Sequence, residues 1–183
     1  IERICSLLPP RRQTLFFSAT MPNEVRKLTG RFLRDPVQLE VARQASTADT
    51  IVQRLLHCSS KPAEKRAALR EQIREAKDLA NAIVFCNRKR DVATLYRSLT
   101  RHGFNAGELH GDMDQKSRME TLDKFKTGKI TLLVASDVAA RGLDIPAVSH
   151  VFNFDVPSHA EDYVHRIGST GRAGHYGASI TLG

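Results

Sequence analysis

Two runs that combine glycine with arginine and hydroxyl side chains, called here the glycine-rich runs, are the parts of this chain best suited to chemistry. They cover residues 136–144 and 165–172. Glycine lets the backbone approach a ligand closely, and the planar guanidinium of arginine matches pairs of phosphate oxygens. One such run is more often a solvated turn. Two of them, each after an apolar strand-like segment, predict a site for a triphosphate or a nucleic-acid backbone.

The composition is that of a globular protein with a basic surface. The chain has 183 residues, a formal net charge of +8 and 41% hydrophobic residues, enough for one compact domain with an appendage. The charge favours a polyanionic partner, although scattered, solvated lysines and arginines would explain it equally well. Three cysteines without a C-x-x-C pair indicate free thiols in a reducing compartment, not a zinc site. With no membrane-length apolar stretch and no signal pattern, we expect a cytoplasmic protein.

From Thr50 onward, apolar runs alternate with helical stretches. The predicted strands are 51–58, 81–86, 106–109, 131–135, 148–154 and 178–182, and the predicted helices are 62–76, 88–102, 114–127 and 159–166. This alternation predicts an α/β fold with a mostly parallel sheet covered by helices on both faces. Ligands bind such sheets at the carboxyl ends of the strands, and we expect both glycine-rich runs there.

Residues at the predicted helix ends support these boundaries. Pro62 suits a first helical position, and Gly103 and Gly128 suit the left-handed residue after a helix. Side chains that can cap the third and fourth helices are Asp112 or Asp114, and Ser158.

The first 42 residues differ from the rest. They predict a short helix, a strand at 13–17, a helix opened by Pro22 and a strand at 37–41, too little to close a core alone. Residues 43–50 are small and polar, as linkers are. We therefore expect residues 1–42 to be the end of one domain and residues 51–183 to be a second, in a fragment cut at both ends.

Six motifs occur in the order found in DEAD-box RNA helicases, and the chain resembles this family, most of all its bacterial members. The motifs are Ser18–Thr20, Ile83–Asn87, His110–Asp112 with Gln115 and Arg118, Ala135–Pro146, Asn153–Pro157 and His165–Arg172. The resemblance implies two RecA-like domains joined by a linker, with RNA across both and ATP between them. Residues 1–42 would be a remnant of the first domain, and residues 51–183 most of the second.

The resemblance also implies roles for individual residues. RNA backbone would be held by Gly111, Gln115, Arg118 and Ser136, the last of which stands where the family usually has threonine. ATP would be contacted by Gly142, Asp144 and Arg172, with Arg172, His165 and Arg166 as the catalytic residues and Arg172 as an arginine finger. Coupling between the domains would involve Ser18, Thr20, Arg141 and His165, although hydroxyls such as Ser18 and Thr20 could equally cap the helix that follows.

Two departures from the family bear on activity. Ser169 stands where the family has a second arginine finger, and serine carries no charge to stabilise a transition state. The chain has no G-x-x-x-x-G-K-[ST] loop and no Asp-Glu-Ala-Asp run, which supply the phosphate cradle and the magnesium ligand. We expect no metal site in this chain, Mg²⁺ held by the missing first domain, and no ATP hydrolysis by the chain alone.

Three functions remain open at this point. The first is the C-terminal half of an ATP-dependent RNA helicase, whose partners are RNA and the missing first domain. The second is a non-catalytic RNA-binding or protein-docking module that keeps the fold, which the absent loop and Ser169 favour. The third is a RecA-type motor acting on DNA, which the combination of Ser18–Thr20 with His110–Asp112 makes weaker. The eleven tyrosines and phenylalanines lie mostly in apolar runs, so base stacking is not supported.

Overall fold

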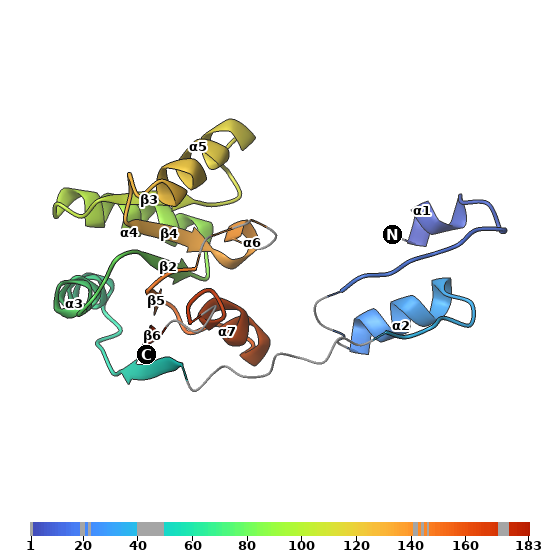
Figure 1. Cartoon of the computed structure of the whole chain (residues 1–183), viewed down its shortest axis with the longest axis horizontal. Helices are drawn as coiled ribbons and strands as arrows, with labels where there is room; N and C mark the ends of the chain where they lie inside the picture. Colours follow the sequence, from blue (N-terminus) through green and yellow to red (C-terminus); the bar gives the residue numbers. More distant parts are fainter. Residues whose placement is uncertain are drawn as a thin grey trace. The chain divides into compact units, whose positions relative to one another are not determined.

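A computed structural model describes residues 2–18, 21, 23–39, 50–140, 143, 145, 147–171 and 176–183. The chain divides into two compact units, Ile1–Ala42 and Arg43–Gly183, each of which is described by itself below (Figure 1).

A parallel six-stranded sheet forms the centre of the second unit. Its strands are β1 (Ile51–Leu56), β2 (Ala82–Cys86), β3 (Ala106–Leu109), β4 (Leu132–Ser136), β5 (His150–Asn153) and β6 (Gly177–Leu182). They pair in the order β1-β6-β5-β2-β4-β3, with every neighbouring pair parallel. Every residue of β2, β4 and β5 is buried, as expected for central strands covered on both faces. The predicted sheet is confirmed.

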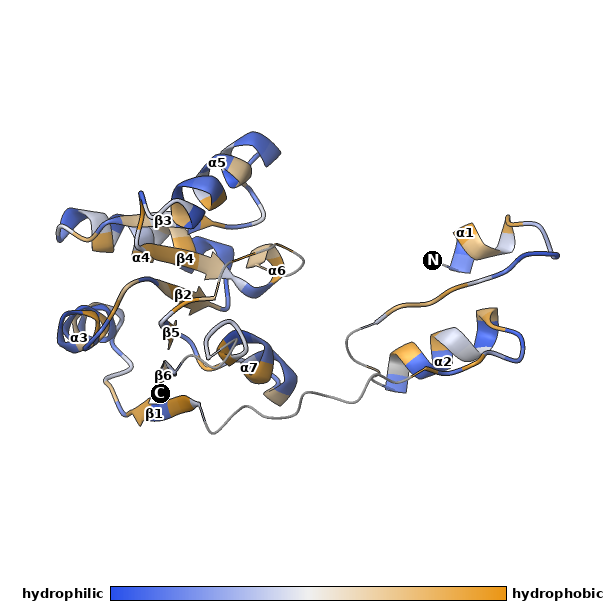
Figure 2. Cartoon of the chain, viewed as in Figure 1, coloured by the Kyte–Doolittle hydropathy of each residue, from blue (hydrophilic) through white to orange (hydrophobic). Residues whose placement is uncertain are grey.

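Helices cover both faces of this sheet, as predicted. On one face lie α3 (Pro62–Glu75) and α4 (Lys89–Arg101), and on the other lie α5 (Gln115–Lys126), α6 (Asp137–Ala140) and α7 (Ala160–Ile167). The four-residue α6 was not predicted, because a single turn leaves no periodic pattern in the sequence. Figure 2 shows the strands as largely apolar, whereas α3 and α5 carry many polar residues.

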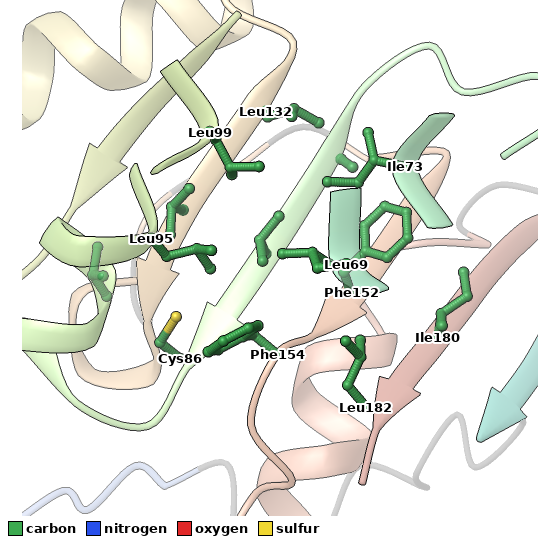
Figure 3. Close-up of a cluster of buried hydrophobic side chains, with 14 residues drawn as sticks. Leu69, Ile73, Cys86, Leu95, Leu99, Leu132, Phe152, Phe154, Ile180 and Leu182 are labelled. Carbon is green, nitrogen blue, oxygen red and sulfur yellow. The ribbon is translucent and has the colours of Figure 1, made fainter. Parts of the chain in front are cut away.

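Two hydrophobic clusters hold the layers together. Successive side chains of a strand point to opposite faces, so Val84 and Cys86 pack toward α3 and α4 while Ile83 and Phe85 pack toward α5 and α6. Figure 3 shows the first cluster, in which Leu69 of α3 and the leucines of α4 meet the strands. Truncating one such buried leucine to alanine typically costs about 2–5 kcal/mol, so these contacts fix where each helix lies on the sheet.

Most of the predicted helix ends agree with the structure. Pro62 is the first residue of α3, the Asp114 carboxylate caps α5 by accepting from the Ser117 backbone N–H at 2.9 Å, and Gly103 and Gly128 have φ of +82° and +72°. The predicted cap Ser158 is wrong. The residue before α7 is His159, which makes no side-chain capping bond.

The first unit contains α1 (Glu2–Ser6) and α2 (Asn23–Phe32). Its predicted strands are wrong over the described residues, because neither 13–17 nor 37–39 forms a strand. An extended segment becomes a β-strand only when a neighbouring strand pairs with its backbone N–H and C=O groups. The side chains of Phe17 and Leu39 are exposed, so these two segments are not packed against another element of the described residues. Pro22 and residues 40–49 lie outside the described residues, so the origin of this unit and the linker stay predictions.

No helix among the described residues is long and apolar enough to cross a membrane.

His150 at the start of β5 makes the stability of the sheet depend on pH. Only 7% of its surface is exposed, and its ring stacks on Phe152 with centroids 6.0 Å apart. Burial lowers the pKa of His150 below its usual 6.5, while Asp78 opposes this shift. The unfolded chain therefore binds a proton near pH 6.5 that the folded chain does not bind until lower pH.

We expect the free energy of unfolding to be insensitive to His150 above pH 6.5 and to decrease as the pH falls below it. Urea unfolding between pH 7.5 and 5 should show that the free energy of unfolding decreases more steeply with falling pH for the wild type than for His150→Gln. The difference between the two slopes should correspond to at most one proton per molecule. Equal slopes in the two proteins would contradict this account of His150.

Candidate functional site

The carboxyl ends of four neighbouring strands bring polar and basic side chains to one edge of the sheet, called here the carboxyl edge. Because β5, β2, β4 and β3 are adjacent and parallel, the residues that follow them succeed one another along this edge. They are Asp155 after β5, Asn87 after β2, Ser136 and Asp137 at the end of β4, and His110–Asp114 after β3.

The loop after β3 and the first turn of α5 form the outer part of this edge. Gly111 is exposed, and a side chain there would meet no heavy atom within 4 Å. The Asp114 carboxylate accepts from the Ser117 hydroxyl at 2.7 Å as well as from its N–H, and these bonds lower the pKa of Asp114. Gln115 is exposed at the first helical position. The positive end of the α5 dipole therefore faces an open, polar surface.

Arg118 connects this turn to β4. One terminal nitrogen of its guanidinium donates to the Ala139 carbonyl oxygen of α6 at 3.3 Å. Its Nε is buried and has no hydrogen-bond partner among the described residues. The register of β3 and β4 places Leu109 beside Ala135, directly before Ser136, whose side chain is buried at the strand end. The structure thus brings Gly111, Gln115, Arg118 and Ser136 to one edge, while the RNA contact that the resemblance implies for them stays a prediction.

Three basic residues at the start of α4 also belong to this edge and were missed. Arg88, Lys89 and Arg90 are exposed, and the Lys89 ammonium lies 2.7 Å from the Asp112 carboxylate. Positive charge at a helix N-terminus is unfavourable with respect to the helix dipole. A basic run directly after the buried strand 82–86 was the signal that could have identified them.

Arg166 of α7 is the most buried charged residue of the site, with 1% of its surface exposed. Its Nε and one terminal nitrogen each donate at 2.7 Å to the two oxygens of Asp137. That terminal nitrogen also donates to Asn87 Oδ1 at 2.6 Å, and the other terminal nitrogen donates to the Asp155 carbonyl oxygen at 2.7 Å and to Asn153 Oδ1 at 3.4 Å. The guanidinium also lies over the Phe85 ring, 5.2 Å from its centroid.

These five bonds use all five N–H donors of the Arg166 guanidinium. Arg166, which the resemblance implies as catalytic, therefore has no donor left for a reacting phosphate in this structure. It is instead the centre of an internal network, and Asp137, Asn87 and Asn153 are site residues that sequence reasoning missed. The acid directly after Ser136 was a visible signal, but nothing in the sequence pairs it with Arg166.

The end of the second glycine-rich run lies at the opposite edge of the sheet, which corrects the expectation that both runs share one edge. Ser169 O accepts from Val148 N at 3.0 Å, and Thr170 forms a parallel bridge with Val148, just before β5 begins. The physical reason is the parallel connection, because α7 must return the chain from the carboxyl end of β5 to the start of β6. The half-exposed Ser169 therefore lies at the amino edge.

Of the remaining predicted site residues, only two lie in the part of the chain that the structure describes. Arg141, Gly142, Asp144, Arg172 and Thr20 lie outside the described residues. Two others are described. His165 is exposed on α7, and Ser18 is exposed in the first unit. Within the described part of the chain, no three histidine, cysteine, aspartate or glutamate side chains are grouped so that they could hold a metal ion.

Comparison with known proteins decides the family. The model of the helicase conserved C-terminal domain matches residues 64–174. The DEAD-box ATP-dependent RNA helicase CshA of Bacillus subtilis is 44% identical over 182 residues, and the ATP-dependent RNA helicase CshA of Listeria monocytogenes is 47% identical over 182 residues. The chain belongs to the DEAD-box RNA helicases. Each alignment covers all of this chain but only 36% and 34% of the two relatives, so the chain spans about a third of their length.

Solved DEAD-box structures agree with this assignment. A structure of S. cerevisiae Dbp5 bound to RNA and ADP BeF3 is 31% identical with a TM-score of 0.79, and covers 99% of this chain and 47% of the Dbp5 chain. The E. coli DEAD-box protein SrmB, bound to regulator of ribonuclease activity A, is 39% identical with a TM-score of 0.67, over 74% of this chain and 78% of its own. The six-stranded sheet is therefore the RecA-like C-terminal domain of a DEAD-box protein.

Gly177 at the start of β6 allows the glycine-rich run to pack against the sheet. A Cβ at this position would overlap the Thr170 hydroxyl oxygen and lie 2.8 Å from Gly171 N. We expect Gly177→Ala to destabilise the domain by about 1–3 kcal/mol, as overpacking does, in urea unfolding of the 183-residue chain. The matched control is Gly111→Ala, where the added methyl group meets open space. Equal losses in the two variants would show that the close approach is unimportant.

Proposed function

We propose that this chain is the C-terminal half of an ATP-dependent DEAD-box RNA helicase that holds the backbone of one RNA strand at the carboxyl edge of its sheet. The observation that supports this most directly is the convergence of Gly111, Gln115, Arg118 and Ser136 on that edge through the pairing of β3 with β4. The CshA relatives are named as ATP-dependent RNA helicases, and the Dbp5 structure contains RNA.

The chemistry of these residues suits phosphate oxygens more than bases. The first turn of α5 offers backbone N–H groups and the Gln115 amide, Ser136 offers a hydroxyl, and the half-buried Arg118 offers a charged donor. Arg88 and Arg90 add exposed positive charge on the same edge. Such contacts give affinity that is sensitive to salt and tolerant of sequence.

We further propose that the chain completes an ATP site whose other half lies in the first RecA-like domain. By the family pattern, Gly142 and Asp144 contact the nucleotide, Arg172 supplies a finger that neutralises charge on the transferred phosphoryl group, and Arg141, His165, Ser18 and Thr20 couple the two domains. Mg²⁺ would be held by the first domain. The chain alone is then inactive, because the phosphate-binding loop lies outside it. The free thiols of Cys58 and Cys86 fit the bacterial cytoplasm.

A non-catalytic RNA-binding or protein-docking module is the second candidate, favoured by one observation. Ser169 replaces a charged finger with a side chain too short to reach across a cleft. The helicase and the module differ in whether the full-length protein shows RNA-stimulated ATP hydrolysis, and that measurement decides between them.

Removing Arg118 should weaken RNA binding through the loss of a phosphate contact. For the full-length protein without nucleotide, we expect Arg118→Ala to lower affinity for single-stranded RNA about tenfold, the effect of one charged hydrogen bond. The slope of log affinity against log salt should also become shallower by about 1. Fluorescence anisotropy at several salt concentrations measures both quantities.

Arg101→Ala is the matched control for this measurement. Arg101 is exposed at the far end of α4, away from the carboxyl edge, and its removal changes the net charge by the same amount. If the two variants lose affinity equally, binding reflects overall charge and the proposed RNA contact is wrong.

Restoring the second finger should raise the rate of hydrolysis. In the full-length protein we expect Ser169→Arg to increase the kcat of RNA-stimulated ATP hydrolysis about 10²-fold or more, the usual effect of one preorganised donor, with RNA affinity unchanged. Ser169→Ala should leave kcat unchanged. Unaltered kcat in Ser169→Arg, alongside normal hydrolysis by the wild type, would contradict the view that Ser169 limits turnover.

A further inference from the structure

We propose that Arg166 is a positioning residue, which together with Asp137 fixes α7 to the RNA-contacting edge so that the two move as one body. This inference rests on the proposed function, because it takes the RNA contacts to lie at the carboxyl edge and Arg172, in the run that follows α7, to contact the nucleotide. Its basis is the network of hydrogen bonds that links Arg166 to the ends of three strands.

The first step concerns what Arg166 can contact. Its side chain is buried and all its donors are used within the protein. Leaving one of the bonds to a neutral acceptor unmade would leave a buried N–H donor unsatisfied, and losing Asp137 would leave a buried charge without its counter-charge, which is costly. A direct role on a phosphate would therefore require the network to be dismantled first.

The second step leads from Arg166 to the RNA contacts. Asp137, which receives two of the five bonds, directly follows Ser136 and begins α6. Two residues further on, the Ala139 carbonyl oxygen accepts from Arg118. The Arg118 guanidinium therefore donates to a short helix whose first residue is fixed to α7, and Ser136 is the residue directly before that helix.

The third step shows why this end of the network is rigid. Asn87 accepts from Arg166 through Oδ1, donates from Nδ2 to the Val156 carbonyl at 2.9 Å, and donates its backbone N–H to Asp155 Oδ2 at 3.0 Å. Asn153 is fully buried and donates to the Thr181 hydroxyl at 3.0 Å. Each amide is oriented by bonds at both ends, so the two acceptors that these amides present to the guanidinium are themselves held in place.

The fourth step leads from Arg166 to the amino edge. Its carbonyl oxygen accepts from Ser169 N at 3.1 Å, and Ser169 O in turn accepts from Val148 N. The exposed His165 precedes it on α7. A nucleotide-driven shift of residues 165–171 would thus be transmitted through Arg166 and Asp137 to Ser136 and Arg118. Coupling through a contiguous network of this kind is testable by double-mutant cycles.

The experiment compares Arg166→Lys, Asp137→Asn and the double variant in the full-length protein, at a temperature where circular dichroism shows each to be folded. Asn87→Ala removes one bond to Arg166 and one to the Val156 carbonyl from an exposed residue, and it serves as a milder variant should the others fail to fold. Ser136→Ala reports loss of an RNA contact alone. The measurements are RNA affinity, kcat of RNA-stimulated ATP hydrolysis, and amide hydrogen exchange of α5, α6 and α7.

We expect each single variant to weaken RNA binding about tenfold and to lower kcat, with the double variant no worse than either single variant. Asn87→Ala should change both quantities in the same direction by less. Ser136→Ala should weaken RNA binding without altering exchange in α7. Exchange should rise in α6 and α7 together in the variants of Asp137 and Arg166, and remain unchanged at the C-terminal end of α5.

Three results would overturn the proposal. Wild-type RNA affinity and kcat in folded variants that have only lost stability would show a merely structural role. A fall in kcat for Arg166→Lys with normal kcat for Asp137→Asn would indicate direct catalysis by Arg166. Additive effects in the double variant would show that the two residues act independently. A wild-type protein without RNA-stimulated hydrolysis would instead contradict the proposed function, and the exchange data would still test the linkage between α6 and α7.

Discussion

Parallel pairing of strands that are buried on both faces is the constraint on which the rest of this domain depends. A parallel strand must be reached by a connection that crosses the sheet, so each loop after a strand begins at the same edge. In this chain the arrangement places the ends of β5, β2, β4 and β3 side by side. Residues separated by dozens of positions in the sequence, such as Asn87 and Asp155, come within hydrogen-bonding distance for this reason.

A buried charge at this edge has a cost that only a complete set of partners can offset. Removing a guanidinium from water is unfavourable unless its donors are satisfied and a counter-charge lies close. Arg166 meets both conditions through Asp137 and three further acceptors. Since hydrophobic side chains could fill the same volume at lower cost, the network is better explained by fixing relative positions than by adding stability. This is the physical basis for treating Arg166 as a residue that positions others.

The domain therefore separates two surfaces that the sequence presents as similar. The carboxyl edge carries the basic and amide side chains of α4 and α5, whereas the end of the run that follows α7 packs against the start of β5 and β6. In the proposed helicase, nucleotide binding influences RNA binding, so a rigid connection between these surfaces would have a direct use. Under this proposal, the arginine network and α7 provide that connection within the second unit.

The sequence by itself determined the layered fold, because continuous apolar runs such as Ala82–Cys86 and helix ends such as Asp114 and Gly128 are local signals that packing reinforces. Its six ordered motifs also indicated the family, and that resemblance implied a shared role for Gln115, Arg118 and Ser136. Local patterns failed where a partner is needed. Residues 13–17 have the composition of a strand but lack a neighbouring strand in the described chain, and α6 is too short to show a period.

The tertiary structure alone decided that Arg166 is buried, that Asp137 and Asn87 are its partners, and that Ser169 lies at the opposite edge from Ser136. These positions depend on which strands are adjacent and on how α7 returns across the sheet. Neither the strand order nor the path of α7 can be read from the spacing of residues along the chain.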